Sequence, residues 1–207
     1  MSNIKKNYFA RTFLAFNTPI LKGLYRVKYV GKENLPLGGG FIMASNHLLA
    51  LDPFYIALGS KKELYFMAKS ELFERSAFSA FLRLLNAFPI KRGTFDRSAL
   101  KFAIKIINDG AVLGIFPEGA RSMKDYLPHE AKPGIAYIAH KCKCDVVPVS
   151  IYNDKKSKLF TRLTVRYGEP IKYKDLMLGD FPDTEDYCRA ADMIMKKIKE
   201  LWAMGHA

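Results

Sequence analysis

Cysteine is scarce in this sequence, and its placement argues against two classes of protein. The three cysteines are Cys142, Cys144 and Cys188, an odd number that provides no disulfide framework of the kind found in small secreted domains. One residue separates Cys142 from Cys144, whereas paired zinc ligands usually have about two, and no second pair completes a site. We therefore expect a reducing compartment and no metal site.

Long apolar runs are also missing. No stretch approaches the roughly 18 to 20 apolar residues that a membrane-spanning helix needs. The basic amino-terminal segment lacks the uninterrupted apolar core and the small-residue cleavage site of a signal peptide. We expect a chain that does not span a membrane.

Acidic residues are outnumbered by basic ones. The sequence has 20 Asp and Glu residues against 33 Lys and Arg, which gives a formal net charge of +13 and a pI near 9.6. Such a balance favours anionic partners, whether nucleic acid, an anionic bilayer or phosphorylated substrates, and charge alone does not choose among them. The length of 207 residues suits one domain with a full core.

The amino-terminal segment is basic and amphipathic. The apolar residues that share one helical face there are Phe9, Phe13, Phe16 and Ile20. Thr18 and Pro19 suit the cap and first position of a new helix, so we expect two short helices meeting at an angle. A membrane interface and docking on the core are the alternatives, and charge favours the membrane. We predict a membrane-associating segment over 1–23 and a catalytic domain over 24–207.

Strand patterns alternate with helical patterns along the rest of the chain. The expected strands are 24–30, 40–44, 64–68, 88–91, 112–116, 146–151 and 163–167. The expected helices are one opening at Pro53, a phenylalanine-rich stretch over 73–85, and 94–108, 134–140 and 187–202. This alternation predicts an α/β single-domain layered fold, with a central mostly parallel or mixed sheet flanked by helices.

A histidine and an aspartate stand between the second strand and the first helix of that domain. His47 follows the strand, and Asp52 precedes Pro53, which suits the first position of a helix. The two side chains can meet only if the intervening loop folds back. They would then form a base and its orienting carboxylate; otherwise Asp52 is a helix N-cap and His47 is structural.

Two other strand ends carry charged residues followed by glycine or serine. These are the stretches 88–93, Phe-Pro-Ile-Lys-Arg-Gly, and 116–122, Phe-Pro-Glu-Gly-Ala-Arg-Ser. In parallel sheets the ligand crevice lies outside the carboxyl ends of the strands. We therefore expect His47, Arg92 and Glu118 to gather around one cleft.

With these stretches in view, the chain resembles the glycerophospholipid acyltransferase family, most closely the lysophosphatidate acyltransferases. The family's Asn-His, four residues, Asp block matches Asn46, His47 and Asp52, and its Phe-Pro-Ile…Arg-Gly block matches 88–93. Its Phe-Pro-Glu-Gly-Thr-Arg-Ser block matches 116–122, with Ala in place of Thr, and 146–150 fits a weaker fourth block. The similarity covers roughly 31–170 and implies a role in phospholipid biosynthesis. Together with the basic amphipathic amino-terminal segment, it leads us to expect a peripheral membrane enzyme on the cytoplasmic face.

The resemblance implies transfer of a fatty acyl group from a thioester to the free hydroxyl of lysophosphatidate, which makes phosphatidate. An alcohol needs a base for such an attack, and we assign that role to His47, with Asp52 fixing its tautomer. The sequence has no Gly-x-Ser-x-Gly elbow and no cysteine near the blocks, so we expect direct attack without an acyl-enzyme or a cofactor.

Basic residues of the second and third blocks would bind the acceptor. Arg92 and Arg121, with Lys91 in support, are expected to hold its phosphate. Glu118 would contact glycerol hydroxyls, order its loop or pair with an arginine, and Lys132 matches a recurrent lysine of the family. The remaining expected substrate-binding residues are Asn46, Gly93, Gly119 and Ser122.

Several alternatives stay open at this stage. The donor is acyl-coenzyme A or acyl-carrier protein, and the acceptor could be glycerol 3-phosphate or another lysolipid. A hydrolase would use the same base on water. A non-enzymatic basic membrane-binding domain explains the charge but leaves the strand-end motifs without a role. Nucleic acid is disfavoured because aromatic residues do not alternate with basic ones on a strand.

Overall fold

The computed structural model describes residues 7–122, 127–154 and 158–207. A seven-stranded sheet is built from β1 (Arg26–Val30), β2 (Phe41–Ser45), β3 (Leu64–Lys69), β4 (Ala87–Ile90), β5 (Val112–Ile115), β6 (Val146–Tyr152) and β7 (Arg162–Tyr167). Its order is β1-β7-β6-β2-β5-β3-β4, and every neighbouring pair is parallel except β6 and β7. The predicted fold class, a layered α/β domain with a mixed sheet, is confirmed.

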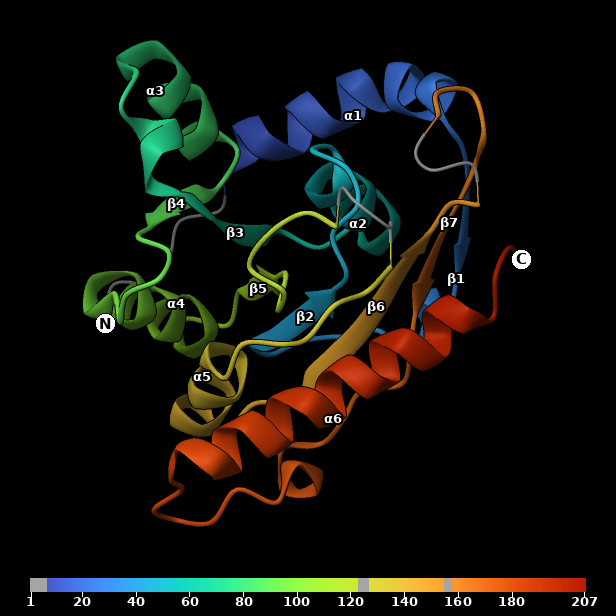
Figure 1. Ribbon diagram of the computed structural model, residues 1–207. Helices are drawn as coiled ribbons and strands as arrows, with labels where there is room; N and C mark the ends of the chain where they lie inside the picture. Colours follow the sequence, from blue (N-terminus) through green and yellow to red (C-terminus); the bar gives the residue numbers. More distant parts are fainter. Residues whose placement is uncertain (1–6, 123–126, 155–157) are drawn as a thin grey trace.

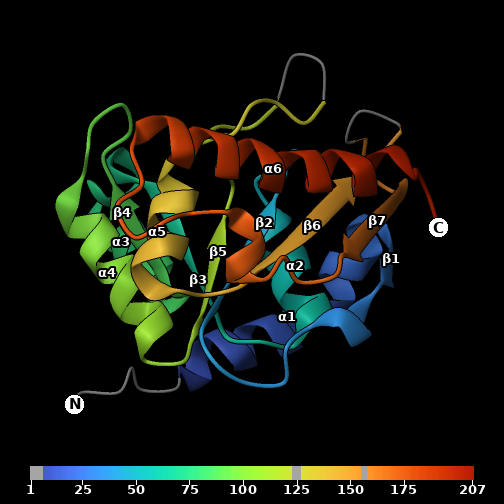
Figure 2. The ribbon, with the colours of Figure 1, turned by 90° about the horizontal axis from the view of Figure 1, so that it is seen from below.

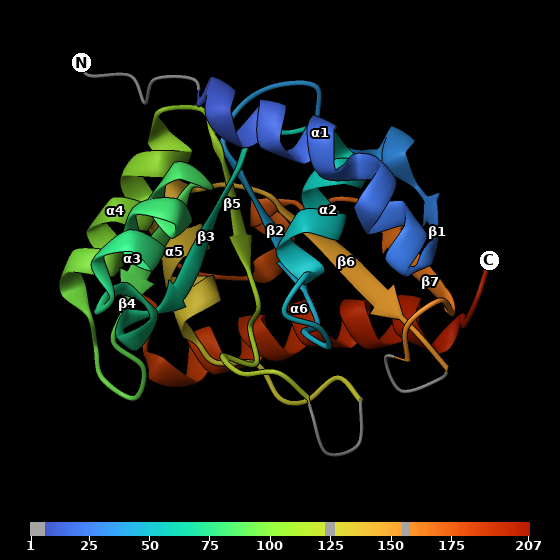
Figure 3. The same cartoon turned by 90° about the horizontal axis from the view of Figure 1, so that it is seen from above.

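Helices cover both faces of this sheet (Figure 1). One face carries α1 (Tyr8–Leu24), α2 (Asp52–Ser60) and α3 (Ser76–Leu84), and α1 and α2 lie across the strands in the view from above (Figure 3). The other carries α4 (Arg97–Asn108), α5 (Gly134–Cys142) and α6 (Thr184–Ala203), seen from below in Figure 2. Each face buries its own apolar cluster. The stretch expected as one helix over 73–85 is divided into a 3₁₀ turn, Ser70–Phe73, and α3.

In the amino-terminal segment Tyr8–Leu24 forms one helix, so the expectation of two short helices is wrong; residues 1–6 of the predicted membrane-associating segment lie outside the described residues. The Thr18 hydroxyl donates to the Leu14 carbonyl, 2.7 Å away, instead of capping a new helix. Pro19 cannot donate to the carbonyl four residues earlier, at Ala15. Both Pro19 and Ala15 are exposed, so water can satisfy that carbonyl and the helix continues.

Helix α1 divides its apolar residues between the core and the surface. Leu21 is buried, and the ring of Phe13 packs against Phe81 with centroids 5.5 Å apart. Phe16 and Ile20 are 81% and 59% exposed. The helix therefore docks on the domain and still presents an outward apolar row. Within the described residues, no helix combines the length and apolar character needed to cross a bilayer.

Candidate active site

The loop between β2 and α2 folds back and brings a histidine onto an aspartate. The His47 Nδ1 atom lies 2.9 Å from the Asp52 Oδ2 atom. The same oxygen accepts hydrogen bonds from the backbone N–H groups of Leu48 and Leu49, at 2.6 and 2.7 Å. Leu51 is the N-cap of α2, so the alternative of Asp52 as an N-cap is wrong. The Asp52 carboxylate instead organises the loop that precedes α2.

Burial controls the electrostatics of this pair. Asp52 is fully buried, and burial raises the pKa of its carboxyl group above the ordinary value. The hydrogen bond from His47 lowers that pKa and so opposes the rise, and the hydrogen bonds from the Leu48 and Leu49 N–H groups act in the same direction with smaller effect. His47 is only partly buried and lines a large groove. Because Asp52 holds Nδ1, Nε2 is the ring nitrogen that can reach a bound molecule in the groove.

Asn46 fixes the end of β2 to β6. Its side-chain amide donates to the Ile151 carbonyl at 2.9 Å and accepts from the Ile151 N–H at 2.8 Å. The sequence leads us to expect a substrate contact at Asn46. Because the side chain is fully buried, it holds the backbone beside His47 in place and does not contact substrate.

An aromatic stack supports the His47 ring. The Phe116 ring lies 4.0 Å from it with an interplanar angle of 16°, and the Phe66 ring follows at 5.8 Å from Phe116. Gly114 leaves room for Phe66, since a Cβ atom there would stand 2.1 Å from that ring. The sequence motif includes Phe116 but gave no indication of this role, because ring stacking follows from strand register.

Glu118 and Ser122 hold the third motif against the histidine. Glu118 Oε1 accepts from the His47 backbone N–H at 3.2 Å, and Oε2 accepts from the Ser122 hydroxyl. The Ser122 N–H in turn donates to the His47 carbonyl at 2.9 Å. Both side chains are buried, and burial raises the pKa of Glu118. Of the roles considered for Glu118, these contacts fit ordering of the loop.

The turn after Glu118 brings a lysine to the site. Gly119 has φ +72°, and a Cβ atom there would lie 3.0 Å from the Cε and Nζ atoms of Lys132. The Lys132 N–H donates to the Pro117 carbonyl at 2.9 Å. Lys132 lies 13 positions after Gly119, so no local pattern predicts this contact. Only the resemblance to the family indicated that Lys132 belongs near the motif.

A groove of about 1160 Å³ passes His47 along the carboxyl edge of β3, β4 and β5. We call the part of the groove on the α1 and α3 side its apolar branch. Its lining includes Ala10, Leu14, Phe54, Ala57, Phe81 and Leu85, together with the polar Lys62, Glu63 and Asn86. The other branch passes α4, α5 and the start of α6, where Phe95, Tyr137 and Tyr187 line it. His47 therefore stands beside a space suited to a molecule with an apolar tail.

Six Lys and Arg residues of the described chain line the groove. Lys91, Arg92 and Arg121 come from the second and third motifs, Lys132 follows the third, and all four are exposed; Lys62 and Lys69 line the groove as well. Across the parts of the chain that the structure describes, neither arginine forms a side-chain ion pair. Gly93, with φ +81°, turns the chain after Arg92. The structure thus gathers His47, Arg92 and Glu118 at one strand edge, as predicted from the motif positions.

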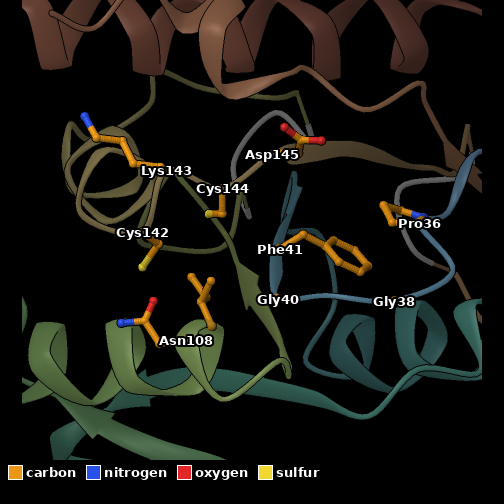
Figure 4. A pocket seen from close by; sticks show the side chains of 10 residues that line it. Pro36, Gly38, Gly40, Phe41, Asn108, Cys142, Lys143, Cys144 and Asp145 are labelled. Carbon is orange, nitrogen blue, oxygen red and sulfur yellow. The ribbon is translucent and has the colours of Figure 1, made fainter.

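A smaller hollow of about 290 Å³ lies at the amino-terminal end of the central strands, where β2 begins (Figure 4). Cys142 and Cys144 line it together with Lys143 and Asp145. Asp145 is engaged with Lys172 and the Tyr173 N–H. The hollow contains no base–acid pair like that at His47, so we place the reaction in the larger groove.

Comparisons with known proteins agree with this geometry. The family model described as Acyltransferase matches residues 26–152. A 1-acyl-sn-glycerol-3-phosphate acyltransferase of Bacillus subtilis (strain 168) is 32% identical over 84% of this chain and 87% of that protein. A second, from Streptococcus pneumoniae, is 32% identical over 66% of this chain and 52% of its own length.

A solved structure has the same fold. The crystal structure of the 1-acyl-sn-glycerophosphate (LPA) acyltransferase PlsC from Thermotoga maritima superposes with a TM-score of 0.66 and 25% identity. The match covers 94% of this chain and 77% of that one. The matched family segment contains the His47–Asp52 pair and both arginine motifs. The chain therefore belongs to the acyltransferase family and is an enzyme of the O-acyltransferase class.

Proposed function

We propose that the protein transfers a fatty acyl group from a thioester to the free hydroxyl of lysophosphatidate. The observation that carries the proposal is the His47–Asp52 pair beside a groove that combines cations with an apolar branch. The relatives named 1-acyl-sn-glycerol-3-phosphate acyltransferases support this choice of acceptor. The thioester is acyl-coenzyme A or acyl-carrier protein.

His47 acts as the general base. Its Nε2 atom takes the proton of the acceptor hydroxyl while the oxygen attacks the thioester carbonyl. The C–O bond forms, the C–S bond breaks, and the leaving thiolate takes up the proton from the imidazolium. Asp52 holds Nδ1–H and stabilises the imidazolium, and the Phe116 ring keeps the imidazole plane fixed.

The cations of the groove bind the acceptor phosphate. Arg92 and Arg121 offer planar donor pairs that match phosphate oxygens, and Lys91 and Lys132 add positive charge. Both arginines lack a side-chain ion pair within the described residues, so their donors are available. This set favours a phosphorylated acceptor over water, and hence transfer over hydrolysis.

The apolar branch between α1, α2 and α3 receives an acyl chain. Leu14 and Phe54 line it near α1 and α2, and Phe81 and Leu85 line it at and just after the end of α3. Moving an acyl chain from water into this branch favours binding by about 0.8 kcal/mol for each buried CH₂ group. A long chain in this branch would anchor the substrate while its polar end stays beside His47.

The outward row of α1 supports the proposal that the enzyme works on a membrane surface. Phe9, Phe16 and Ile20 are 45%, 81% and 59% exposed, and Lys22 near the end of the same helix is also exposed. Apolar insertion with positive charge favours an anionic bilayer surface. We assign the protein to the cytoplasmic face as a peripheral enzyme. Changing Phe9, Phe16 and Ile20 to Ser, and leaving the packed Phe13 intact, should release it from anionic vesicles.

An acceptor panel tests the proposed function. Purified protein is given a long-chain acyl thioester with lysophosphatidate, glycerol 3-phosphate or lysophosphatidylcholine, and the products are separated by mass. We expect phosphatidate to form at least about tenfold faster than any other ester. Charge-assisted phosphate contacts disfavour lysophosphatidylcholine, and burial of an acyl chain in the apolar branch disfavours glycerol 3-phosphate. Free fatty acid as the main product would indicate a hydrolase, and preference for glycerol 3-phosphate would reassign the acceptor.

A further inference from the structure

The exposed side of α4 carries positive charge next to aromatic rings. We call it the α4 face and define it by Lys91, Arg92, Phe95, Arg97, Lys101 and Phe102. Phe95 and Phe102 are 63% and 40% exposed, and the four cations are all exposed. Arg97 and Lys101 stand one helical turn apart, so they form a stripe on the same side of the helix.

One carboxylate, Asp96, lies within the α4 face. Hydrogen bonds from the Lys91 N–H, the Ser98 hydroxyl and the Ala99 N–H lower its pKa to about 2, so it carries a negative charge at neutral pH. Asp109 pairs with Lys105 at the other end of the helix. Neither Arg97 nor Lys101 forms an ion pair in the described portion of the chain. Four cations against one carboxylate leave the α4 face with an excess of positive charge that favours an acidic partner.

The α4 face is continuous with the active-site groove. Lys91, Arg92 and Phe95 line the groove, while Arg97 and Lys101 lie beyond its lining. A substrate confined to the groove would not reach Arg97 and Lys101. A partner that touches the groove mouth and the α4 face together must extend over the protein surface.

The position of α4 separates this face from the proposed membrane surface. Helix α1 covers one side of the sheet and α4 packs on the other (Figures 1 and 3). When the outward row of α1 lies on a bilayer, the α4 face points toward water. A soluble acidic protein fits that situation, whereas the bilayer itself does not.

We propose that the α4 face is the docking surface for a small acidic protein that carries the acyl group as a thioester. The inference rests on the proposed acyltransfer and chooses between its two donor classes. The carrier's acidic surface binds Arg97 and Lys101, Phe95 and Phe102 pack against its apolar side chains, and the acyl thioester passes Arg92 into the groove. Coenzyme A offers phosphates to the cations but no apolar protein surface to cover Phe95 and Phe102.

Charge reversal with two donors tests the inference. The double variant Arg97→Glu/Lys101→Glu is compared with wild type for transfer of one acyl chain from acyl-carrier protein and from acyl-coenzyme A to the same lysophosphatidate. The charge-matched control is Lys196→Glu/Lys199→Glu, at two exposed positions of α6. Sedimentation with anionic vesicles and thermal unfolding are measured for all three proteins.

We expect the KM for acyl-carrier protein to rise about tenfold or more in the α4 variant. In wild type this KM should also rise with added salt, because charges at the edge of a protein interface control the rate at which the two proteins associate. The rate with acyl-coenzyme A, vesicle binding and Tm should match those of the control. An unchanged KM for the carrier donor, an equal loss with both donors, or reduced vesicle binding would each overturn the inference. If wild type uses only acyl-coenzyme A, the docking proposal fails and the proposed function stands. If wild type uses neither donor, the proposed function itself fails.

Discussion

Replacing Asp52 by Asn removes one charge from the site and keeps the shape of the side chain. The Asn oxygen can occupy the position of Oδ2, where it accepts from Leu48, Leu49 and His47 as the carboxylate does. The amide NH₂ group then occupies the position of Oδ1, which is buried and, in the portion the structure describes, has no hydrogen-bond partner. The substitution thus preserves the loop and the His47 tautomer and removes the negative charge beside the imidazolium.

The effects of Asp52→Asn on stability and on catalysis can be estimated separately. A buried NH₂ group without an acceptor costs about 1 to 3 kcal/mol of unfolding free energy, and relief of carboxylate burial offsets part of it. Loss of the charge should lower kcat at least about a hundredfold, which is about 2.7 kcal/mol of transition-state stabilisation. Asp52→Ala is less informative, because it strips the acceptor from two backbone N–H groups and disturbs the loop.

The assay is steady-state transfer to lysophosphatidate, with urea unfolding measured on the same preparation. Asp192→Asn on α6 is the matched control, since that carboxylate is exposed and does not line the groove. The control should retain full kcat. An Asp52→Asn protein with kcat within about threefold of wild type, at unchanged stability, would refute the role of the Asp52 charge in stabilising the imidazolium.

Three further predictions follow from the same contacts. Arg92→Ala and Arg121→Ala should each raise the KM for lysophosphatidate about tenfold while the donor KM stays constant; equal effects would place the arginines at the donor. Ser122→Ala should lower kcat more than it changes either KM, because it frees Glu118 from one partner; a selective rise in acceptor KM would mean direct substrate contact. Burial lowers the pKa of His140 below its ordinary value of 6.5, so its imidazole binds a proton more readily in the unfolded chain than in the folded one. The unfolding free energy should therefore fall as the pH drops below about 6.5. Urea titrations from pH 8 to 5 should show a weaker pH dependence in His140→Gln, and identical profiles would contradict this.

Most of the fold could be predicted because its signals are local. Apolar runs and their spacing placed the seven strands to within a few residues, since buried parallel strands are continuous in hydrophobicity. The amino-terminal helix shows where local rules fail. The Thr18-Pro19 pair is a sound helix-start signal, yet docking of Phe13 and Leu21 on the domain keeps one helix running through it.

The candidate site was predictable only in its residue types. His47 and Asp52 were identifiable from their spacing, but the loop that joins them depends on the N–H groups of Leu48 and Leu49. The clamp of Asn46 on Ile151 spans 105 residues of sequence, and no local pattern encodes it. Roles that depend on burial, such as those of Asn46 and Glu118, required the structure.

The central claim is that His47 removes the proton from the acceptor hydroxyl. The most direct measurement is a single-turnover assay of His47→Gln with prebound acyl thioester and lysophosphatidate, beside thermal unfolding. The account predicts acyl transfer slowed at least about a hundredfold, with Tm close to that of wild type and unchanged acceptor binding. Transfer that retains more than about a tenth of the wild-type rate would contradict the claim.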